Sequence, residues 1–249
     1  MSTDQNLIVL LGPTASGKTA LAVELACALD GEIISADSRQ IYRRLDIGTG
    51  KDLKEYGFIP YHLIDSHEIG DAFSVAHFQK AAFDAINDVF ARDKQPILCG
   101  GTGLYIESLL ANYQFSHVPH FLTEPLDIQF NYTVFGLNPS TDLRREKISK
   151  RLKARLKEGM LDEVQQLLFE GVHPQELRWM GLEYKWIVNF VEGLISREEF
   201  EKGLESAIHQ FAKRQMTYFR KMERAGIKIN WIPDSLDFQA KRDFILNFI

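Results

Sequence analysis

The sequence predicts an α/β fold, a P-loop NTPase-like parallel sheet flanked by helices, with a C-terminal helical cap. Two observations carry this prediction. Apolar strand-like runs alternate with helical patterns over residues 7–137, as βα units require. From 142 to 224 the pattern is almost entirely helical. We therefore expect an α/β core at 1–138, a basic helical cap at 139–226, and a return strand and tail at 227–249 that pack on the core.

The first unit is a strand, a glycine-bounded loop and a helix. An apolar run at 7–11 and a helical pattern at 20–26 enclose Gly12, Pro13, Thr14, Ala15, Ser16, Gly17, Lys18 and Thr19. This G-x-x-x-x-G-K-[ST] spacing is that of a phosphate-binding P-loop. The loop N–H groups and the helix N-terminus attract phosphate, and Lys18 adds a full positive charge. The Thr19 hydroxyl is a ligand for Mg²⁺, so we expect a di- or triphosphate with Mg²⁺ as cofactor.

Two further strands end in polar residues. Asp37 follows the predicted strand 31–36, and Thr102 follows the strand 96–99 within a glycine-rich loop that opens a helix at 104–110. Ligands of open parallel sheets bind beyond the carboxyl ends of the strands, so both side chains are expected beside the P-loop. A structural alternative is that Asp37 caps a short helix and that the glycines only form a tight turn.

Two other positions have a functional and a structural interpretation. A short strand is predicted to end in Asp65, where many P-loop proteins keep an acid that supports Mg²⁺. In the long helix predicted from Ser196 to Arg224, Gln215 falls within the apolar stripe and Arg214 at its border. Buried polar groups need partners, and for Arg214 these are a diphosphate or an internal salt bridge.

Charge is distributed unevenly along the chain. The net charge is −5 in total, −8 up to Thr141 and +3 from Asp142 onward. Such a basic region either binds a nucleic-acid backbone or forms a solvated helix face. Cys27 and Cys99 have apolar neighbours and are expected to be buried free thiols. No run is long enough to cross a membrane and residues 1–6 do not form a signal-peptide pattern, so we expect a cytoplasmic protein.

These motifs together resemble a known family. G-P-T-A-S-G-K-T, I-S-A-D-S-R-Q-I-Y, D-I-G-T-G-K, H-L-I-D, G-G-T-G-L-Y-I and F-A-K-R-Q-M-T-Y-F-R follow one another as in tRNA dimethylallyltransferases. The resemblance covers about 7–110 and 130–233. It implies transfer of the dimethylallyl group from dimethylallyl diphosphate to N6 of an adenosine next to the tRNA anticodon, with release of diphosphate. The implied partners are dimethylallyl diphosphate and the tRNA anticodon loop, and the chain is expected to be a monomer without membrane contact.

The resemblance also implies roles for individual residues. Asp37 is the implied general base, Thr102 lies at the diphosphate and the reacting centre, and Lys18 stabilises the leaving group. The P-loop residues and Arg214 bind the diphosphate. The segment of Asp37, Ser38, Arg39 and Gln40 faces the tRNA nucleotide. This chemistry needs positive charge at the departing diphosphate and a base at the amine, which these residue types supply.

The chain departs from the family pattern in two places. Family members usually carry a longer helical insertion where this chain has only 111–129, and they usually have Ala and Pro where it has Gly50 and Asp52. Adenylate dimethylallyltransferases, which prenylate free AMP, are therefore an alternative. A small-molecule P-loop kinase that uses ATP, or a paralogue that only binds RNA or nucleotide, explains fewer of the motifs.

Overall fold

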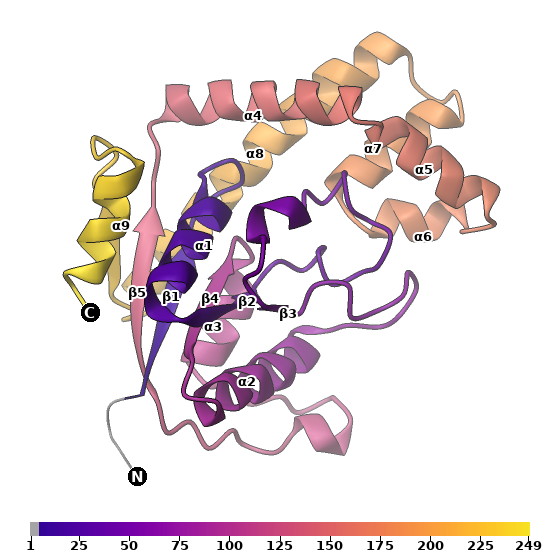
Figure 1. Cartoon of the computed structure of the whole chain (residues 1–249). Helices are drawn as coiled ribbons and strands as arrows, with labels where there is room; N and C mark the ends of the chain where they lie inside the picture. Colours follow the sequence, from indigo (N-terminus) through magenta and orange to yellow (C-terminus); the bar gives the residue numbers. More distant parts are fainter. Residues whose placement is uncertain (1–4) are drawn as a thin grey trace.

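The computed structural model describes residues 5–249, apart from the side chain of Phe121. A six-stranded parallel sheet runs through this part of the chain in the order β3-β2-β4-β1-β5-β6 (Figure 1). Its strands are β1 (Asn6–Leu11), β2 (Gly31–Ser35), β3 (Tyr61–His62), β4 (Gln95–Gly100), β5 (Asn131–Leu137) and β6 (Ile229–Ile232). The predicted α/β class with a parallel sheet is confirmed.

Helices cover both faces of the sheet because its central strands are apolar on both sides. Leu7, Val9 and Leu11 of β1 face a core with α2 (Val75–Ala91), α3 (Gly103–Leu110) and α8 (Arg197–Arg224). Ile8 and Leu10 face a second core with α1 (Lys18–Leu29) and α9 (Phe238–Leu246). This pattern of continuous burial is typical of parallel sheets.

The remaining helices form a layer beyond the carboxyl ends of the strands (Figure 1). They are α4 (Thr141–Lys157), α5 (Met160–Phe169), α6 (Pro174–Trp179) and α7 (Leu182–Val191). Together with the first half of α8 they enclose a third core, which also takes in Ile41, Tyr42 and Leu45 from the loop after β2. The layer is thereby fixed to the edge of the sheet at which ligands bind.

Several local predictions were wrong. The helices α6 and α9 were not predicted, although His173 and Asp237 cap them. The strand predicted to reach Asp65 ends at His62, because Leu63 and Asp65 have positive φ angles of 60° and 52°. Residues after Asp37 form a turn instead of a short helix. Both cysteines are free, as predicted, but Cys27 is exposed and only Cys99 is buried.

The membrane and signal-peptide predictions are addressed only in part. In residues 5–249, no helix combines the length and the apolar character needed to span a membrane. The prediction about the N-terminal segment concerns residues 1–6, of which residues 1–4 lie outside the described residues. Two short 3₁₀ helices, η1 (Leu53–Tyr56) and η2 (His120–Leu122), lie in the loops around the sheet.

Candidate active site

A cavity of about 560 Å³ lies where the P-loop, the loops after β2 and β4, and helices α4, α7 and α8 meet. The predicted site residues that line it are Thr14, Lys18, Thr19, Asp37, Ser38, Arg39, Gln40, Thr102 and Arg214. A second cavity of about 280 Å³ is lined by Ala15, Ser16, Gly17, Lys18 and Thr19. Lys18 and Thr19 therefore lie between two openings. Gly12 and Pro13, which precede them, line neither cavity.

The P-loop is held by the long helix α8. The buried amide of Gln215 accepts a hydrogen bond from the Thr14 N–H at 2.9 Å and donates one to the Gly101 carbonyl at 3.0 Å. A Cβ on Gly101 would overlap the Gln215 amide, so this close approach requires glycine. The polar residue within the predicted apolar stripe thus links the P-loop to the glycine-rich loop after β4.

Two P-loop side chains, Ser16 and Lys18, are suited to bind a phosphate group. The Ser16 hydroxyl is buried and has no hydrogen-bond partner among the described residues. Burial lowers the pKa of Lys18, and the nearby cations Arg151 and Arg155 lower it further, against the opposing effects of Cys99 and Asp37. A bound anion would offset this crowding of positive charge.

Asp37 and Thr102 lie on adjoining loops. The Asp37 Oδ1 accepts a hydrogen bond from the Arg39 N–H at 3.0 Å, and within residues 5–249 this carboxylate has no ion-pair partner. The Thr102 hydroxyl accepts from the Ser38 N–H at 3.1 Å, which leaves its own proton available to a ligand. Both side chains line the larger cavity, so a free carboxylate and a hydroxyl face one space.

The rest of this segment is tied to its surroundings. The Gln40 amide accepts from the Ser35 hydroxyl at 3.0 Å and donates to the Gly50 carbonyl at 3.2 Å, so its polar atoms hold two loops together. Arg39 donates to the Trp179 carbonyl at 3.1 Å, at the end of α6. The segment is therefore a rigid wall of the cavity.

Arg214 projects to the cavity without an internal salt bridge. It has neither an ion pair nor a hydrogen bond with the described part of the chain, and its guanidinium carbon lies 5.9 Å from the centre of the Phe211 ring. Of the two partners that the sequence left open for Arg214, the internal salt bridge is therefore not found.

Asp65 does not line the cavity. It pairs with Lys51, which is 1% exposed and also contacts Asp46 at 2.7 Å and the Tyr42 carbonyl at 2.7 Å. Asp65 thus stabilises the loop that follows Gln40, and the predicted support of Mg²⁺ by this acid does not fit its position.

The residues present do fit a Mg²⁺ held mainly by phosphate oxygens. Over residues 5–249, no group of three His, Cys, Asp or Glu side chains is arranged to hold a metal by itself. A P-loop site does not need such a group, because Mg²⁺ takes oxygen ligands from phosphates, water and one hydroxyl. Thr19, whose hydroxyl would be that ligand, lines both cavities.

The structure adds cavity residues that the sequence did not single out. Burial raises the pKa of Glu183, and Arg155 opposes this effect. In the sequence, Glu183 shows only the usual preference for acids in the first turn of a helix. Three large apolar side chains at the cavity, Leu104, Trp179 and Phe211, are 39%, 71% and 39% exposed. They form an apolar rim, of which helical periodicity in the sequence marks only Phe211.

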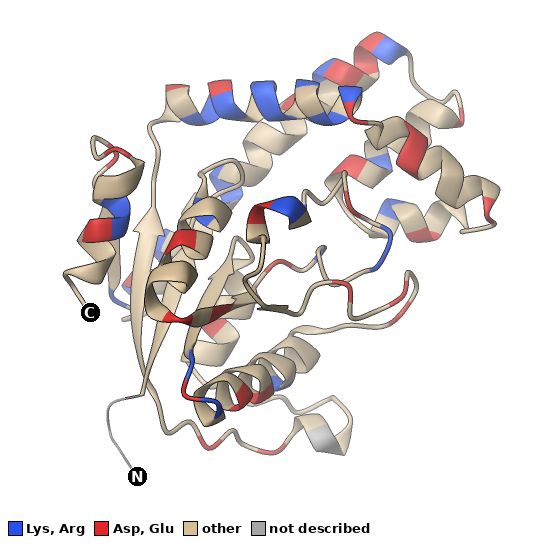
Figure 2. Cartoon of the chain, viewed as in Figure 1, with Lys and Arg blue, Asp and Glu red and all other residues tan. Residues whose placement is uncertain are grey.

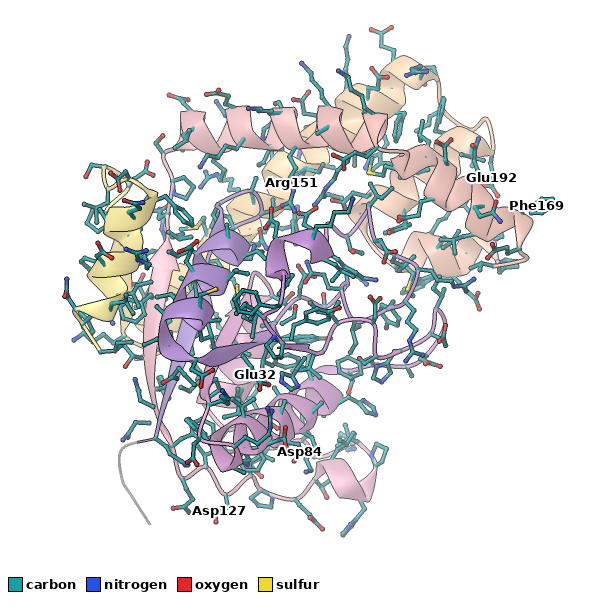
Figure 3. The ribbon with its side chains drawn as sticks, viewed as in Figure 1. Glu32, Asp84, Asp127, Arg151, Phe169 and Glu192 are labelled. Carbon is teal, nitrogen blue, oxygen red and sulfur yellow. The ribbon has the colours of Figure 1, made fainter. Side chains whose placement is uncertain are left out.

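Basic residues gather in a second region, on the opposite side of α8. A hollow of about 970 Å³ between α4 and α8, called here the basic groove, is lined by Arg144, Arg145, Lys202, Lys213 and Arg220, with Glu205 and His209. Figure 2 shows the Lys and Arg positions along α4 above the sheet. Figure 3 shows Arg151 on the side of α4 that faces the sheet and its helices.

Comparison with known proteins identifies the family to which this chain belongs. The protein-family model described as IPP transferase matches residues 40–129 and 115–222. The family model described as isopentenyl transferase matches residues 5–58. The chain is 43% identical to tRNA dimethylallyltransferase 1 of Parabacteroides distasonis, over 94% of both chains. This chain belongs to the tRNA dimethylallyltransferase family.

Solved structures agree with this assignment to the tRNA dimethylallyltransferases. The fold is similar to that of tRNA delta(2)-isopentenylpyrophosphate transferase from Staphylococcus epidermidis, with a TM-score of 0.86, 30% identity and 98% of both chains covered. The full-length tRNA isopentenylpyrophosphate transferase of Bacillus halodurans gives 0.87, 28% identity, and coverage of 98% of this chain and 95% of that one.

The comparisons also bear on the shortened region of this family member. The alignment with the Parabacteroides distasonis protein runs over 290 residues, whereas this chain has 249, so that relative carries segments that are absent here. The two matches to the IPP transferase model overlap at 115–129, within the short connection between α3 and β5. Both observations agree with the predicted absence of the insertion.

Proposed function

We propose that this protein transfers the dimethylallyl group of dimethylallyl diphosphate to N6 of the adenosine next to a tRNA anticodon. The observation that carries this proposal is the convergence of the P-loop, Asp37 and Thr102 on one cavity. A phosphate site, a free carboxylate and a hydroxyl are the groups that an amine-to-allyl transfer needs. The membership of the chain in this family supports the proposal.

The proposed reaction forms one bond and breaks another. The N6 nitrogen attacks the allylic carbon, the bond from this carbon to the diphosphate oxygen breaks, and the N6 proton passes to the Asp37 carboxylate. Lys18, the P-loop N–H groups and Arg214 bind the diphosphate as its charge grows, and Thr102 donates a hydrogen bond beside it. Mg²⁺, held by Thr19 and the phosphates, would neutralise part of the same charge.

The acceptor is proposed to be RNA because of the surroundings of the cavity. The apolar rim of Leu104, Trp179 and Phe211 offers flat surfaces for unstacked bases. The basic groove offers cations for a phosphate backbone. A free nucleotide needs neither feature. We also propose that the protein acts in the cytoplasm and as a monomer.

The alternative acceptor is free AMP, which the short connection at 111–129 favours. The test is an assay of label transfer from dimethylallyl diphosphate, labelled in its prenyl group, to unmodified tRNA, AMP and ATP with Mg²⁺ present. We expect label in tRNA, in a single modified adenosine, and none when guanosine replaces this adenosine. Label in AMP but not in tRNA would establish the adenylate activity, and phosphate transfer from ATP to a small acceptor would establish a kinase.

A further inference from the structure

Arg155 is a buried cation that makes no hydrogen bond with the described residues. Its side chain lies in α4 and the residue is 8% exposed, yet the Nε atom has no partner in the described part of the chain. Its nearest acid is Asp52, whose Oδ2 lies 4.0 Å from Nη2, beyond hydrogen-bond distance. A buried guanidinium with unused donors is costly unless a ligand completes its hydrogen bonds. The unused donors thus point to an anion that binds beside Arg155.

The space for this guanidinium depends on Gly50. A Cβ at position 50 would overlap the Arg155 guanidinium and lie 2.7 Å from the Arg151 Nη2. Gly50 also has a φ of +64°, where side chains are strained. Any side chain at position 50 is therefore incompatible with the observed place of the Arg155 guanidinium.

Asp52 belongs to the same arrangement. It pairs with Arg151, and Arg151 also donates to the Gly50 carbonyl at 3.3 Å. Gly50 and Asp52 thus make room for Arg151 and Arg155 and orient them. We call these two arginines the arginine pair.

The arginine pair faces the P-loop. Both arginines line the larger cavity together with Lys18, and Arg151 also lines the smaller cavity behind the P-loop. The acids that face Arg155 are Asp52 and Glu183. Asp52 is already engaged by Arg151, so Lys18 and the arginine pair face only the Glu183 and Asp37 carboxylates among the acids that line the larger cavity. Phosphate groups are the anions that such a site binds best.

We propose that Arg155, for which Gly50 makes room, is an additional ligand of the donor's diphosphate, beside the P-loop and Arg151. This inference rests on the proposed function only for the identity of the donor. A phosphate of the acceptor RNA has the same chemistry, and the measurements below separate the two sources.

The test measures binding of inorganic pyrophosphate with Mg²⁺ by calorimetry, in the absence of any acceptor. Arg155→Met should weaken binding about 10-fold, as expected for loss of charge-assisted hydrogen bonds. Gly50→Ala should weaken it to a similar extent, because the added Cβ displaces the guanidinium. In the Arg155→Met background, Gly50→Ala should change binding less than about 2-fold, since the two changes remove the same interaction.

Controls separate binding from folding. Lys153→Met removes an exposed cation of the same helix that lines neither cavity, and it should leave pyrophosphate binding unchanged. Thermal unfolding of each variant shows whether the fold is intact. Arg155→Lys keeps the charge in a smaller group and should bind pyrophosphate better than Arg155→Met.

The outcomes are distinct. Unchanged pyrophosphate binding by a folded Arg155→Met variant would overturn the proposal, and so would additive effects of Gly50→Ala and Arg155→Met. If Arg155→Met weakened binding of tRNA alone, the arginine would serve the acceptor backbone. Failure of the parent protein to prenylate tRNA while it still binds pyrophosphate through Arg155 would instead count against the proposed function.

Discussion

Gln215 accepts a hydrogen bond from the backbone N–H of Thr14 at 2.9 Å, although 201 residues separate the two in the sequence. The same amide reaches the Gly101 carbonyl, so a residue of the helical layer sets the relative position of two loops of the sheet. The phosphate site and the loop of Thr102 are thereby one rigid unit.

Gln215→Leu should therefore damage both the fold and the donor site. It leaves a buried N–H and a buried carbonyl without partners, which costs about 1–3 kcal/mol in the free energy of unfolding. Urea unfolding and pyrophosphate affinity measure the two effects. Gln210→Leu, at an exposed position of the same helix, is the control. Equal behaviour of the two variants would refute the linking role of Gln215.

Asp37→Asn should slow turnover by roughly 10²–10⁴-fold, the usual effect of removing a positioned general base. The asparagine oxygen can still accept from the Arg39 N–H, so the turn and the binding of dimethylallyl diphosphate should stay near normal. Single-turnover measurements on tRNA test this. A variant that kept most of its rate would show that Asp37 only shapes the turn.

Trp179→Ala should weaken tRNA binding, because its exposed indole lies at the cavity and can stack on an unpaired base. Stacking is worth about 1–3 kcal/mol per base. Binding of pyrophosphate should not change, and Trp179→Phe should keep most of the affinity for tRNA. The control is Phe169→Ala, since Phe169 is 86% exposed on α5 and lines neither cavity (Figure 3). An equal loss in both variants would exclude a specific role for Trp179.

The basic groove should control how tRNA binding depends on salt. Each neutralised phosphate contributes a slope of about −0.7 to −0.9 to the dependence of log affinity on log salt. Replacing Arg144 and Arg145 by alanine should flatten that dependence by about one to two units and leave donor binding unchanged. Lys80 and Lys94, which lie outside the groove, are the control pair. If the slope stayed the same, the backbone would bind elsewhere.

Glu32 should make stability depend on acid pH. Hydrogen bonds from Arg92 and His62, at 2.9 and 2.7 Å, lower the pKa of this buried carboxyl below its usual 4.5. Because the folded pKa lies below the unfolded one, the ionised carboxylate stabilises the fold above the unfolded pKa. This stability is lost as pH falls through the folded pKa.

Glu32→Gln should accordingly cost about 1–3 kcal/mol at pH 7, and the difference from the parent should shrink as pH falls below the usual carboxyl pKa of 4.5. Urea unfolding at a series of pH values measures it. Glu198→Gln, in an exposed pair with Lys202, should change stability little at any pH. A loss for Glu32→Gln that did not vary with pH would reflect packing instead of charge.

Local patterns were sufficient for much of the fold. The P-loop, its strand and its helix are adjacent in the sequence, so spacing and apolar periodicity predicted them, and α7 (Leu182–Val191) has the bounds that the pattern predicted. The placement of Asp37 and Thr102 at one edge of the sheet followed from the geometry of parallel strands. Local signals failed at α6 and α9, which have only 6 and 9 residues.

By itself, the sequence determined the parallel α/β class, the phosphate-binding loop and the family resemblance, because each depends on residues close together in the chain. Only the tertiary structure decided which partners the buried polar groups find. Asp65 pairs with Lys51 instead of facing the P-loop, Gln215 reaches Thr14, and Gly50 makes room for Arg155. Such contacts join distant segments, and their geometry depends on how the helical layer packs on the sheet, which no local pattern encodes.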